Sequence, residues 1–284
     1  MKVTEAFQKP SPALSFEFFP PKTPEQERLL FEVIGKLKAF RPDFVSVTYG
    51  AMGKTREKTF FWVKEIKDKF GIEPVAHLTC VAATKDDIAR QIDELAKMGV
   101  ENILALRGDP PEGTRDFAPP ADGFKYAKEL IGFIKNKKPG ICLGAAGFPE
   151  SRQSIDHLKQ KVAAGAEYII TQLFFDNKFY FDFVARCRQA GITVPILPGL
   201  MPITSYHQIK KMTEVCGASI PPELLASLEA RRDDPQAIID LGAEQTACQA
   251  RQLLAADVPG LHFFVMNQAE PISAILKQLG LKNK

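Results

Sequence analysis

The sequence has few cysteines, no long apolar run and little net charge, and each absence excludes a class of protein. Its five cysteines are odd in number, dispersed and never in a C-x-x-C pair, which argues against a disulfide framework and against a zinc or iron–sulfur site. No apolar run approaches the roughly 18 residues of a membrane helix, and the N-terminus lacks the apolar segment of a signal peptide. The formal net charge of +3, with no basic block, does not indicate a nucleic-acid partner. We therefore expect a reduced, cytoplasmic protein with no membrane and no nucleic-acid partner.

Short apolar segments alternate with amphipathic helical segments along the whole chain. The predicted strands lie at residues 15–19, 43–50, 74–80, 102–106, 141–146, 168–175, 195–202 and 260–267. Predicted helices include residues 56–70, 123–136, 151–164, 177–190 and 270–279, with two or three more in 204–257. Near-continuous apolar strands separated by helices are typical of a parallel sheet covered by helices.

The number of strand–helix units decides between two α/β architectures. Eight units in 284 residues favour a closed (β/α)8 TIM barrel over an open doubly wound sheet. No G-x-G-x-x-G fingerprint for a dinucleotide follows the first strand. Neither a linker nor a change of composition interrupts the pattern, so we expect one domain over residues 1–284.

The first strand, with the sequence SFEFFPP at residues 15–21, holds one carboxylate among three phenylalanines. Aromatic residues at this density favour a strand, and the two prolines end it. Glu17 is therefore expected near the C-terminal end of a buried strand, where apolar surroundings raise the pKa of a carboxyl group. A raised pKa suits a general acid. The alternative is that Glu17 points to solvent or pairs with a structural arginine.

Polar residues occur at the C-terminal ends of the predicted strands, which is where the active site of a (β/α)8 barrel lies. They are Glu17, Thr48, His77, Arg107, Asp109, Gln172 and Asn267. Glu17 and Asp109 are carboxylates in different settings, as is typical of groups with separated pKa values. His77 is either a base or, more commonly within an apolar strand, a hydrogen-bonded core residue. No cluster of His, Asp and Glu has metal-ligand spacing, so we predict no metal site.

The segments at these strand ends resemble the methylenetetrahydrofolate reductase family in its bacterial single-domain form. Matching segments run in order along nearly the whole chain, at residues 15–22 (SFEFFPPK), 44–51 (FVSVTYGA), 77–80 (HLTC), 104–109 (LALRGD), 170–175 (ITQLFF) and 197–202 (LPGLMP). The resemblance implies an oxidoreductase whose (β/α)8 barrel holds FAD at the C-terminal strand ends. It implies ping-pong hydride transfer from NADH or NADPH through FAD to 5,10-methylenetetrahydrofolate, giving 5-methyltetrahydrofolate for one-carbon metabolism and methionine biosynthesis.

The resemblance also implies roles for individual residues. Glu17 is expected to be the general acid that helps to open the five-membered ring to an iminium ion, and Asp109 to tune the flavin and pterin rings. The residues that match cofactor-binding positions are Thr48, His77, Arg107, Gly108, Asp109, Tyr126, Ala127, Ala145 and Lys161. Those that match substrate-binding positions are Glu17, Phe19, Asp109, Gln172 and Met266. Relatives form oligomers, so we expect a homo-oligomer; the choice between NADH and NADPH stays open.

The sequence departs from the family pattern mainly where the resemblance places FAD. The segment at residues 147–154 is several residues shorter than in many relatives, and Gln160 stands where an arginine is common, while Lys161 is kept. Loss of a cation weakens the grip on a pyrophosphate, so we expect weaker FAD occupancy. Three alternatives follow: a flavin-free reductase, a reductase that needs an electron-donor partner subunit, and a non-redox folate-binding barrel in methyl transfer.

Overall fold

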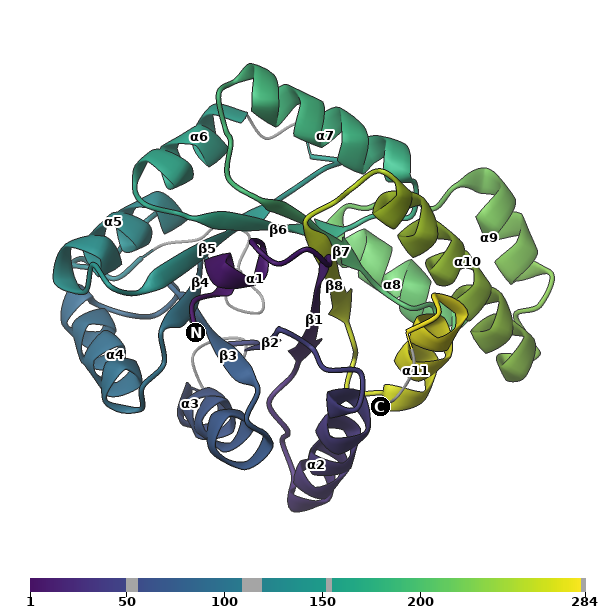
Figure 1. Ribbon diagram of the computed structural model, residues 1–284, viewed down its shortest axis with the longest axis horizontal. Helices are drawn as coiled ribbons and strands as arrows, with labels where there is room; N and C mark the ends of the chain where they lie inside the picture. Colours follow the sequence, from purple (N-terminus) through teal and green to yellow (C-terminus); the bar gives the residue numbers. More distant parts are fainter. Residues whose placement is uncertain (50–55, 109–118, 152–154, 282–284) are drawn as a thin grey trace.

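Eight parallel strands form a closed barrel at the centre of the computed structural model, which describes residues 1–49, 56–108, 119–151 and 155–281 (Figure 1). The strands are β1 (Ala13–Phe18), β2 (Phe44–Val47), β3 (Glu73–Thr79), β4 (Asn102–Leu106), β5 (Cys142–Gly147), β6 (Tyr168–Leu173), β7 (Ile196–Leu200) and β8 (Gly260–Phe264). Each strand pairs with the next in sequence, and β8 pairs with β1, which closes the sheet. The predicted (β/α)8 barrel is confirmed.

Helices surround the barrel and connect its strands (Figure 1). They are α1 (Val3–Ala6), α2 (Pro24–Lys38), α3 (Arg56–Glu65), the π-helix η2 (Ile66–Phe70), α4 (Lys85–Lys97), α5 (Ala127–Lys137), α6 (Ile155–Ala163), α7 (Asn177–Gln189), α8 (Tyr206–Cys216), α9 (Pro222–Glu229), α10 (Pro235–Ala255) and α11 (Ala269–Gln278). The predicted start of α5 at residue 123 is wrong, because Tyr126 is the N-cap and Glu129 accepts hydrogen bonds from the backbone amides of Lys125 and Tyr126. None of the described helices is long and apolar enough to cross a membrane.

Side chains alternate between two faces along each strand, and this alternation separates two apolar cores. Phe16 and Phe18 of β1 belong to the large core between the barrel and its helices. The smaller core fills the barrel interior. It combines Val3 of α1 with residues on the other face of the strands, which are Phe44, Val75, Leu104, Cys142, Tyr168, Ile170 and Leu197. A Cβ atom added at Gly144 would lie 2.4 Å from Cζ of Tyr168, which is too close for two carbon atoms. Glycine at this position therefore leaves space for the Tyr168 ring in the barrel interior.

Helix α1 lies across the opening at the N-terminal end of the barrel (Figure 1). The backbone amide of Val3 donates to Asn102 Oδ1 at 2.8 Å, and the ring of Phe7 contacts the rings of Phe44 and Tyr168. This end of the barrel is therefore closed by apolar packing. The polar residues discussed below lie toward the opposite end.

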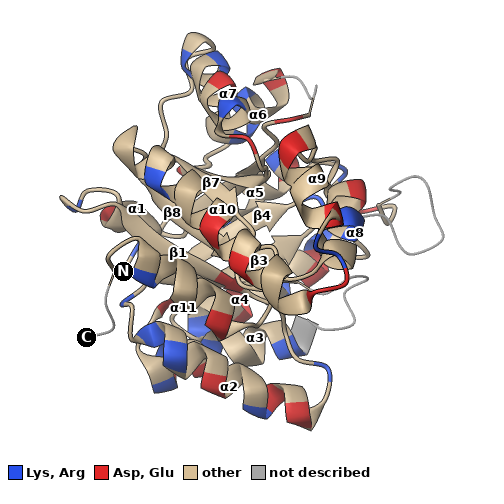
Figure 2. Cartoon of the chain, turned by 90° about the vertical axis from the view of Figure 1, so that its right-hand side faces the viewer, with Lys and Arg blue, Asp and Glu red and all other residues tan. Residues whose placement is uncertain are grey.

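The helical surface carries charges of both signs. In Figure 2, basic and acidic residues are interspersed over α2 and over the segment from α8 to α10. Ion pairs join neighbouring helices on this surface; one of them is Lys36 of α2 with Glu270 of α11, at 2.7 Å. Exposed pairs of this kind contribute little to stability.

Candidate active site

Four strands bring polar side chains together inside the barrel, next to the interior apolar core. Glu17 of β1 has Ser46 of β2 as its register partner, and Ser15 of β1 has His262 of β8. His77 comes from the middle of β3. All five side chains are buried, Glu17 being the most exposed at 8%. We call these residues (Ser15, Glu17, Ser46, His77 and His262) the Glu17 cluster.

One carboxylate oxygen of Glu17 receives most contacts within the Glu17 cluster. Oε2 accepts a hydrogen bond from Ser46 Oγ at 3.1 Å and lies 3.2 Å from His77 Nε2 and 3.5 Å from His262 Nε2. On the other side of the His262 ring, Nδ1 lies 2.9 Å from Ser15 Oγ. The Ser15 hydroxyl in turn donates to the carbonyl oxygen of Leu261 at 3.3 Å. Among the described residues no group of three His, Cys, Asp or Glu is arranged to hold a metal ion.

Two opposing effects set the charge of the Glu17 carboxyl group. Burial raises its pKa, but the Coulombic and hydrogen-bond contributions of His77 and His262 outweigh burial and hold the pKa below its ordinary value. The predicted raised pKa of this residue is therefore wrong. The reason is the alternation of the strand: Phe16 and Phe18 point to the helices, so imidazoles and hydroxyls surround Glu17 instead of aromatic rings.

A second polar group lies at the C-terminal ends of β4 and β5. Lys161 of α6 donates to the carbonyl oxygen of Ala146 at 3.0 Å, and its ammonium lies 5.7 Å from the centre of the Phe148 ring. Burial, and to a smaller extent the positive charge of Arg107, lower the pKa of Lys161 to about 8. The largely buried ammonium of Lys161, influenced by the positive charge of the exposed Arg107, suits an anionic group such as a phosphate.

An exposed aromatic ring lies at the start of α5. Tyr126 is 43% exposed, and the ammonium groups of Lys125 and Lys128 lie 5.5 and 5.6 Å from the centre of its ring. Lys128 also donates to Gln160 Oε1 at 2.6 Å. The ammonium group of Lys128 therefore lies beside Gln160, a neutral residue.

One side chain joins the segments that follow β1 and β8. The backbone amide of Phe19 donates to Asn267 Oδ1 at 3.0 Å, and Asn267 Nδ2 donates to the carbonyl oxygen of Phe19 at 2.9 Å. Met266 and Asn267 both have left-handed backbones, with φ of 53° and 55°. Such a conformation is costly for residues other than glycine and persists where the surroundings fix it. Phe19, which is 38% exposed, is thus held at the rim of the barrel.

The whole chain, including these strand ends, follows one family pattern. It matches the family model described as methylenetetrahydrofolate reductase over residues 2–280. It is 36% identical over 276 residues to the 5,10-methylenetetrahydrofolate reductase of Salmonella typhimurium, an alignment that covers 95% of this chain and 91% of that protein. The chain belongs to the methylenetetrahydrofolate reductase family. The resemblance inferred from the strand-end segments is confirmed.

Relatives of this family differ in length. The chain is 35% identical over 298 residues to methylenetetrahydrofolate reductase (NADH) 1 of Zea mays, covering 99% of this chain but 50% of the plant protein. The chain thus spans about half the length of the plant relatives that it matches. A solved structure has a TM-score of 0.68 and 18% identity, covering 97% of this chain and 96% of its own. It is described as an uncharacterized protein from Clostridium thermocellum that binds two copies of 5-methyl-5,6,7,8-tetrahydrofolic acid, and this likeness shows the fold.

The other residues to which the resemblance assigns a role lie at or near strand ends. Thr48 follows β2, Arg107 and Gly108 follow β4, and Met266 follows β8. Gln172 lies near the end of β6, where its Oε1 accepts a hydrogen bond from the backbone amide of Leu173. Their contacts with ligands stay predictions.

Three other predicted residues have different surroundings. Ala127 is the first residue of α5 and is buried. Ala145 is fully buried in the core that faces the helices, so its side chain does not reach the barrel interior. Asp109 lies outside the described residues, and its predicted catalytic and binding roles stay predictions.

Ser15, Ser46 and His262 are cluster members that the sequence analysis did not assign to the site. A signal for them exists in the alternation of each strand: Ser15 shares the face of Glu17, and Ser46 and His262 are polar residues in otherwise apolar segments. His77, for which a base and a core residue were the two alternatives, is a buried residue whose Nε2 faces Glu17.

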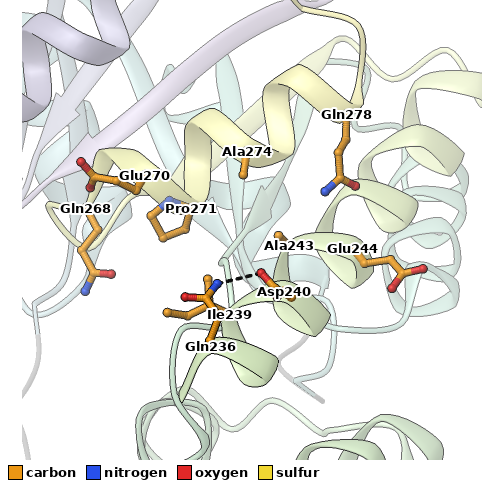
Figure 3. A pocket seen from close by; sticks show the side chains of 10 residues that line it. All are labelled: Gln236, Ile239, Asp240, Ala243, Glu244, Gln268, Glu270, Pro271, Ala274 and Gln278. Atoms are coloured by element: carbon orange, nitrogen blue, oxygen red, sulfur yellow. Dashed lines mark hydrogen bonds between the residues drawn. The ribbon is translucent and has the colours of Figure 1, made fainter. Parts of the chain in front are cut away.

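A surface groove of about 710 Å³ lies between α10 and α11, on the outside of the barrel (Figure 3). Its walls carry the carboxylates of Asp240, Glu244 and Glu270 and the amides of Gln268 and Gln278. None of the predicted site residues lines it. The groove is therefore separate from the Glu17 cluster.

Proposed function

We propose that this protein reduces 5,10-methylenetetrahydrofolate to 5-methyltetrahydrofolate with NADH or NADPH, as a single catalytic domain over residues 1–284 with FAD as its cofactor. The observation that carries the proposal is the buried Glu17 carboxyl group, held among two imidazoles and two hydroxyls inside the barrel of a member of this family. A buried acid that is surrounded by proton-bearing groups suits a reaction that consumes a proton.

Glu17 is the general acid in this proposal. Protonation of a nitrogen in the five-membered ring weakens its bond to the bridging carbon, which opens to an iminium ion that accepts a hydride. The carboxylate left behind is stabilised by the Ser46 hydroxyl and by His77. Because Glu17 is shielded from water, the proton is passed to the substrate rather than exchanged with bulk solvent during the step.

The rim of the barrel supplies surfaces for the substrate. Phe19, fixed by Asn267, offers an exposed aromatic face to a flat ring, and Met266 lies in the same joined segment. Gln172 lies near the end of β6, and its amide suits hydrogen bonds to a pterin or a nicotinamide. In the proposal Asp109 is the second catalytic carboxylate.

The residues near Lys161 fit the anionic part of FAD. Burial and the positive charge of Arg107 lower the pKa of Lys161, so a bound phosphate would favour the charged form of Lys161. Tyr126 offers an exposed ring, and Thr48, His77, Gly108, Ala127 and the backbone of Ala145 complete the proposed contacts. When bound, FAD accepts a hydride from the nicotinamide and donates it to the folate. Lys128, bonded to Gln160, places a cation where many relatives carry an arginine, which works against the predicted weak occupancy.

The visible spectrum of protein purified without added cofactor tests the proposal. Flavin bands that bleach on addition of NADH or NADPH and return with 5,10-methylenetetrahydrofolate are the expected result. A colourless protein that reduces the folate only after FAD is added retains the reaction and demonstrates weak cofactor binding. A colourless protein that reduces it without flavin favours direct hydride transfer from the nicotinamide. Activity that appears only with a second protein favours an electron-donor partner subunit. Folate binding without any nicotinamide oxidation contradicts an oxidoreductase.

The oligomeric state belongs to the same proposal. The family resemblance implies oligomers, so we propose a homo-oligomer in solution. Sedimentation equilibrium of the purified protein tests it, and a mass of 31.5 kDa for the single chain at all concentrations contradicts it.

A further inference from the structure

We infer that Lys58 is a positioning residue: it holds residues 19–22, which follow β1, and thereby orients Phe19 toward the folate. We call residues 19–22 the Phe19 segment. The ammonium group of Lys58 binds the backbone of the Phe19 segment, so Lys58 acts on the substrate only through this segment. The inference rests on the proposed function, because it explains how the flat ring of the substrate is aligned with Glu17.

The first turn of α3 is hydrogen-bonded to the ends of two neighbouring strands. Lys58 Nζ donates to the carbonyl oxygen of Pro21 at 3.2 Å and to that of Lys22 at 3.1 Å. The next residue, Thr59, is fully buried, and its hydroxyl donates to the carbonyl oxygen of Thr48 at 3.0 Å. Because β1 and β2 pair in the sheet, α3 joins the two segments that follow them.

The place of Lys58 within α3 does not favour the helix itself. A helix has the positive end of its dipole at the N-terminus, so cations are favourable near the C-terminus instead. Lys58 is the third residue of α3, where its charge opposes the dipole. The two carbonyl oxygens of the Phe19 segment offset this cost, since hydrogen bonds from a charged donor are among the stronger ones. The cation therefore serves the Phe19 segment and not α3.

The Phe19 segment is stiff, so what holds one of its ends also affects the other. Its two central residues are Pro20 and Pro21, whose rings fix φ at about −65° and restrict the residue before each of them. At the start of the segment, Phe19 exchanges two hydrogen bonds with Asn267. At its end, Lys58 binds two carbonyl oxygens. Asn267 and Lys58 together therefore fix the orientation of Phe19.

The orientation of Phe19 matters because the acid lies two residues before it in the chain. The carbonyl oxygen of Glu17 accepts a hydrogen bond from the backbone amide of Val265 at 3.3 Å, so the backbone of Glu17 is fixed to the segment after β8. In the proposed function a ring that stacks on Phe19 presents a nitrogen to Glu17. A displacement of about 1 Å disturbs this alignment, and misplacements of this size slow catalysis by up to about 10²-fold.

Binding of 5-methyltetrahydrofolate, measured by calorimetry, tests the inference without turnover. Lys58→Met keeps an unbranched side chain and removes the ammonium group. We expect the Kd to rise about tenfold in this variant and to recover in Lys58→Arg, whose guanidinium can donate to two oxygens. Lys64→Met is the matched control, because Lys64 lies on the same helix and pairs with Asp68 at the surface. It should bind the folate as tightly as the wild type.

A double variant tests whether Asn267 and Lys58 act on one stiff segment. Asn267→Gly removes the hydrogen bonds at the start of the Phe19 segment, and Lys58→Met removes those at its end. Since either loss frees the same segment, we expect the double variant to bind the folate little more weakly than either single variant. A Kd that rises by the product of the two single effects, about 100-fold, overturns the inference, because the two residues would then act independently.

Hydrogen–deuterium exchange reports on the Phe19 segment in protein that has no folate bound. The backbone amides of Phe19 and Lys22 donate to Asn267 Oδ1 and to Gln26 Oε1. We expect both amides to exchange faster in Lys58→Met than in the wild type, and at the wild-type rate in the Lys64→Met control. A lower melting temperature of Lys58→Met with unchanged exchange and unchanged folate affinity overturns the inference, because it assigns Lys58 to stability alone.

The outcomes separate this inference from the proposed function. A wild-type protein that binds no folate contradicts the proposed function, whereas hydrogen–deuterium exchange still decides whether Lys58 holds the Phe19 segment. A wild-type protein that binds the folate no more tightly than Lys58→Met overturns the inference alone. If Lys58→Met does not fold, Lys58→Gln, which has a shorter and neutral side chain, replaces it in every comparison.

Discussion

At the scale of single residues, the protonation of Glu17 depends on facing strands and not on sequence neighbours. The phenylalanines on either side of it pack against helices, while its contacts come from β2, β3 and β8. A chain segment can therefore be strongly apolar and still place its one carboxylate in polar surroundings. In the proposed mechanism, the acidity of Glu17 therefore depends on the residues that face it and not on its neighbours in sequence.

Substitution of Glu17 by glutamine tests its role as the acid. The amide has nearly the same shape, but it cannot donate an acidic proton. We expect the folate half-reaction to slow by 10² to 10⁴, roughly the contribution of general acid catalysis, while hydride transfer from NADH to the flavin is slowed far less. Stopped-flow absorbance of the two half-reactions measures both. Equal slowing of both half-reactions would assign Glu17 to cofactor placement instead.

The lowered pKa of Lys161 predicts how the free energy of unfolding depends on pH. Its pKa is about 8 in the folded protein and about 10.5 in an unfolded chain. Between these values the unfolded state binds a proton that the folded state does not, so the free energy of unfolding rises with pH over this window. Relative to Lys161→Met, we expect the wild type to be less stable at pH 7 by up to roughly 2 kcal/mol, allowing for its partial exposure.

Urea denaturation of both proteins at pH 7 and pH 10.5 measures this difference, which should nearly vanish at the higher pH. Addition of FAD at pH 8 should raise the pKa of Lys161 and cause proton uptake, detected by calorimetry in buffers of different ionisation enthalpy. A stability difference that does not depend on pH would mean that Lys161 is charged in the folded state throughout.

At the scale of elements, the order and type of the strands followed from the sequence, but some of their ends did not. Residues 102–106 were predicted and found as β4, because polar residues and a glycine bound this apolar run. The strand predicted to reach residue 175 ends at Leu173. Its apolar run continues because Phe174 stacks on Tyr180 of α7. Hydrophobicity alone does not distinguish a residue in the sheet from one that packs on the next helix.

The composition of the site was predictable only in part for a related reason. Glu17 was identified because a carboxylate in an apolar strand is unusual. Which face of β1 points inward cannot be read when both faces are buried, so the surroundings of Glu17 were assigned wrongly. His262 is 245 residues away from Glu17 in sequence (262 − 17), and only the register of β8 on β1 brings them together.

The two hydrogen bonds between Phe19 and Asn267 form a bridge between the segments that follow β1 and β8, and this bridge can be tested by mutation. Asn267→Gly removes both hydrogen bonds to Phe19 but suits the left-handed backbone, whereas Asn267→Ala removes the bonds and adds strain. We expect both variants to raise the KM for the folate about tenfold, with kcat changed less. The alanine variant should be less stable than the glycine variant by about 1 kcal/mol.

Steady-state kinetics and thermal unfolding measure the two effects separately. Asp257 also has a left-handed backbone, with φ of 57°, but it precedes β8 at the other end of the barrel. Asp257→Gly should therefore leave the KM unchanged. A normal KM in Asn267→Gly would show that Phe19 is not positioned by the bridge.

At the scale of the whole molecule, the two ends of the barrel have different tasks. The N-terminal end is closed by α1 and by the interior apolar core, and the Glu17 cluster lies among polar residues toward the C-terminal end. In barrels of this type the N-terminal face contributes to stability and the C-terminal face to catalysis. The interior core lies between them, so a change at α1 reaches the Glu17 cluster only through closely packed side chains.

Phe7→Ala tests this separation. The Phe7 ring contacts Phe44 and Tyr168 across the barrel opening, and its removal leaves a space that the closed barrel cannot easily fill. Since Phe7 is only partly buried, we expect the free energy of unfolding to fall by roughly 2 kcal/mol, less than for a fully buried ring. The KM for the folate and the ratio of the half-reaction rates should not change, because the cavity forms beneath the interior core.

Phe181→Ala on α7, where the ring is 39% exposed, is the matched control and should cost less than about 0.5 kcal/mol. Urea denaturation measures the free energy of unfolding, and steady-state kinetics on the same samples measures the KM for the folate. A KM that rises in proportion to the lost stability would mean that packing at the N-terminal end of the barrel affects the site at the C-terminal end.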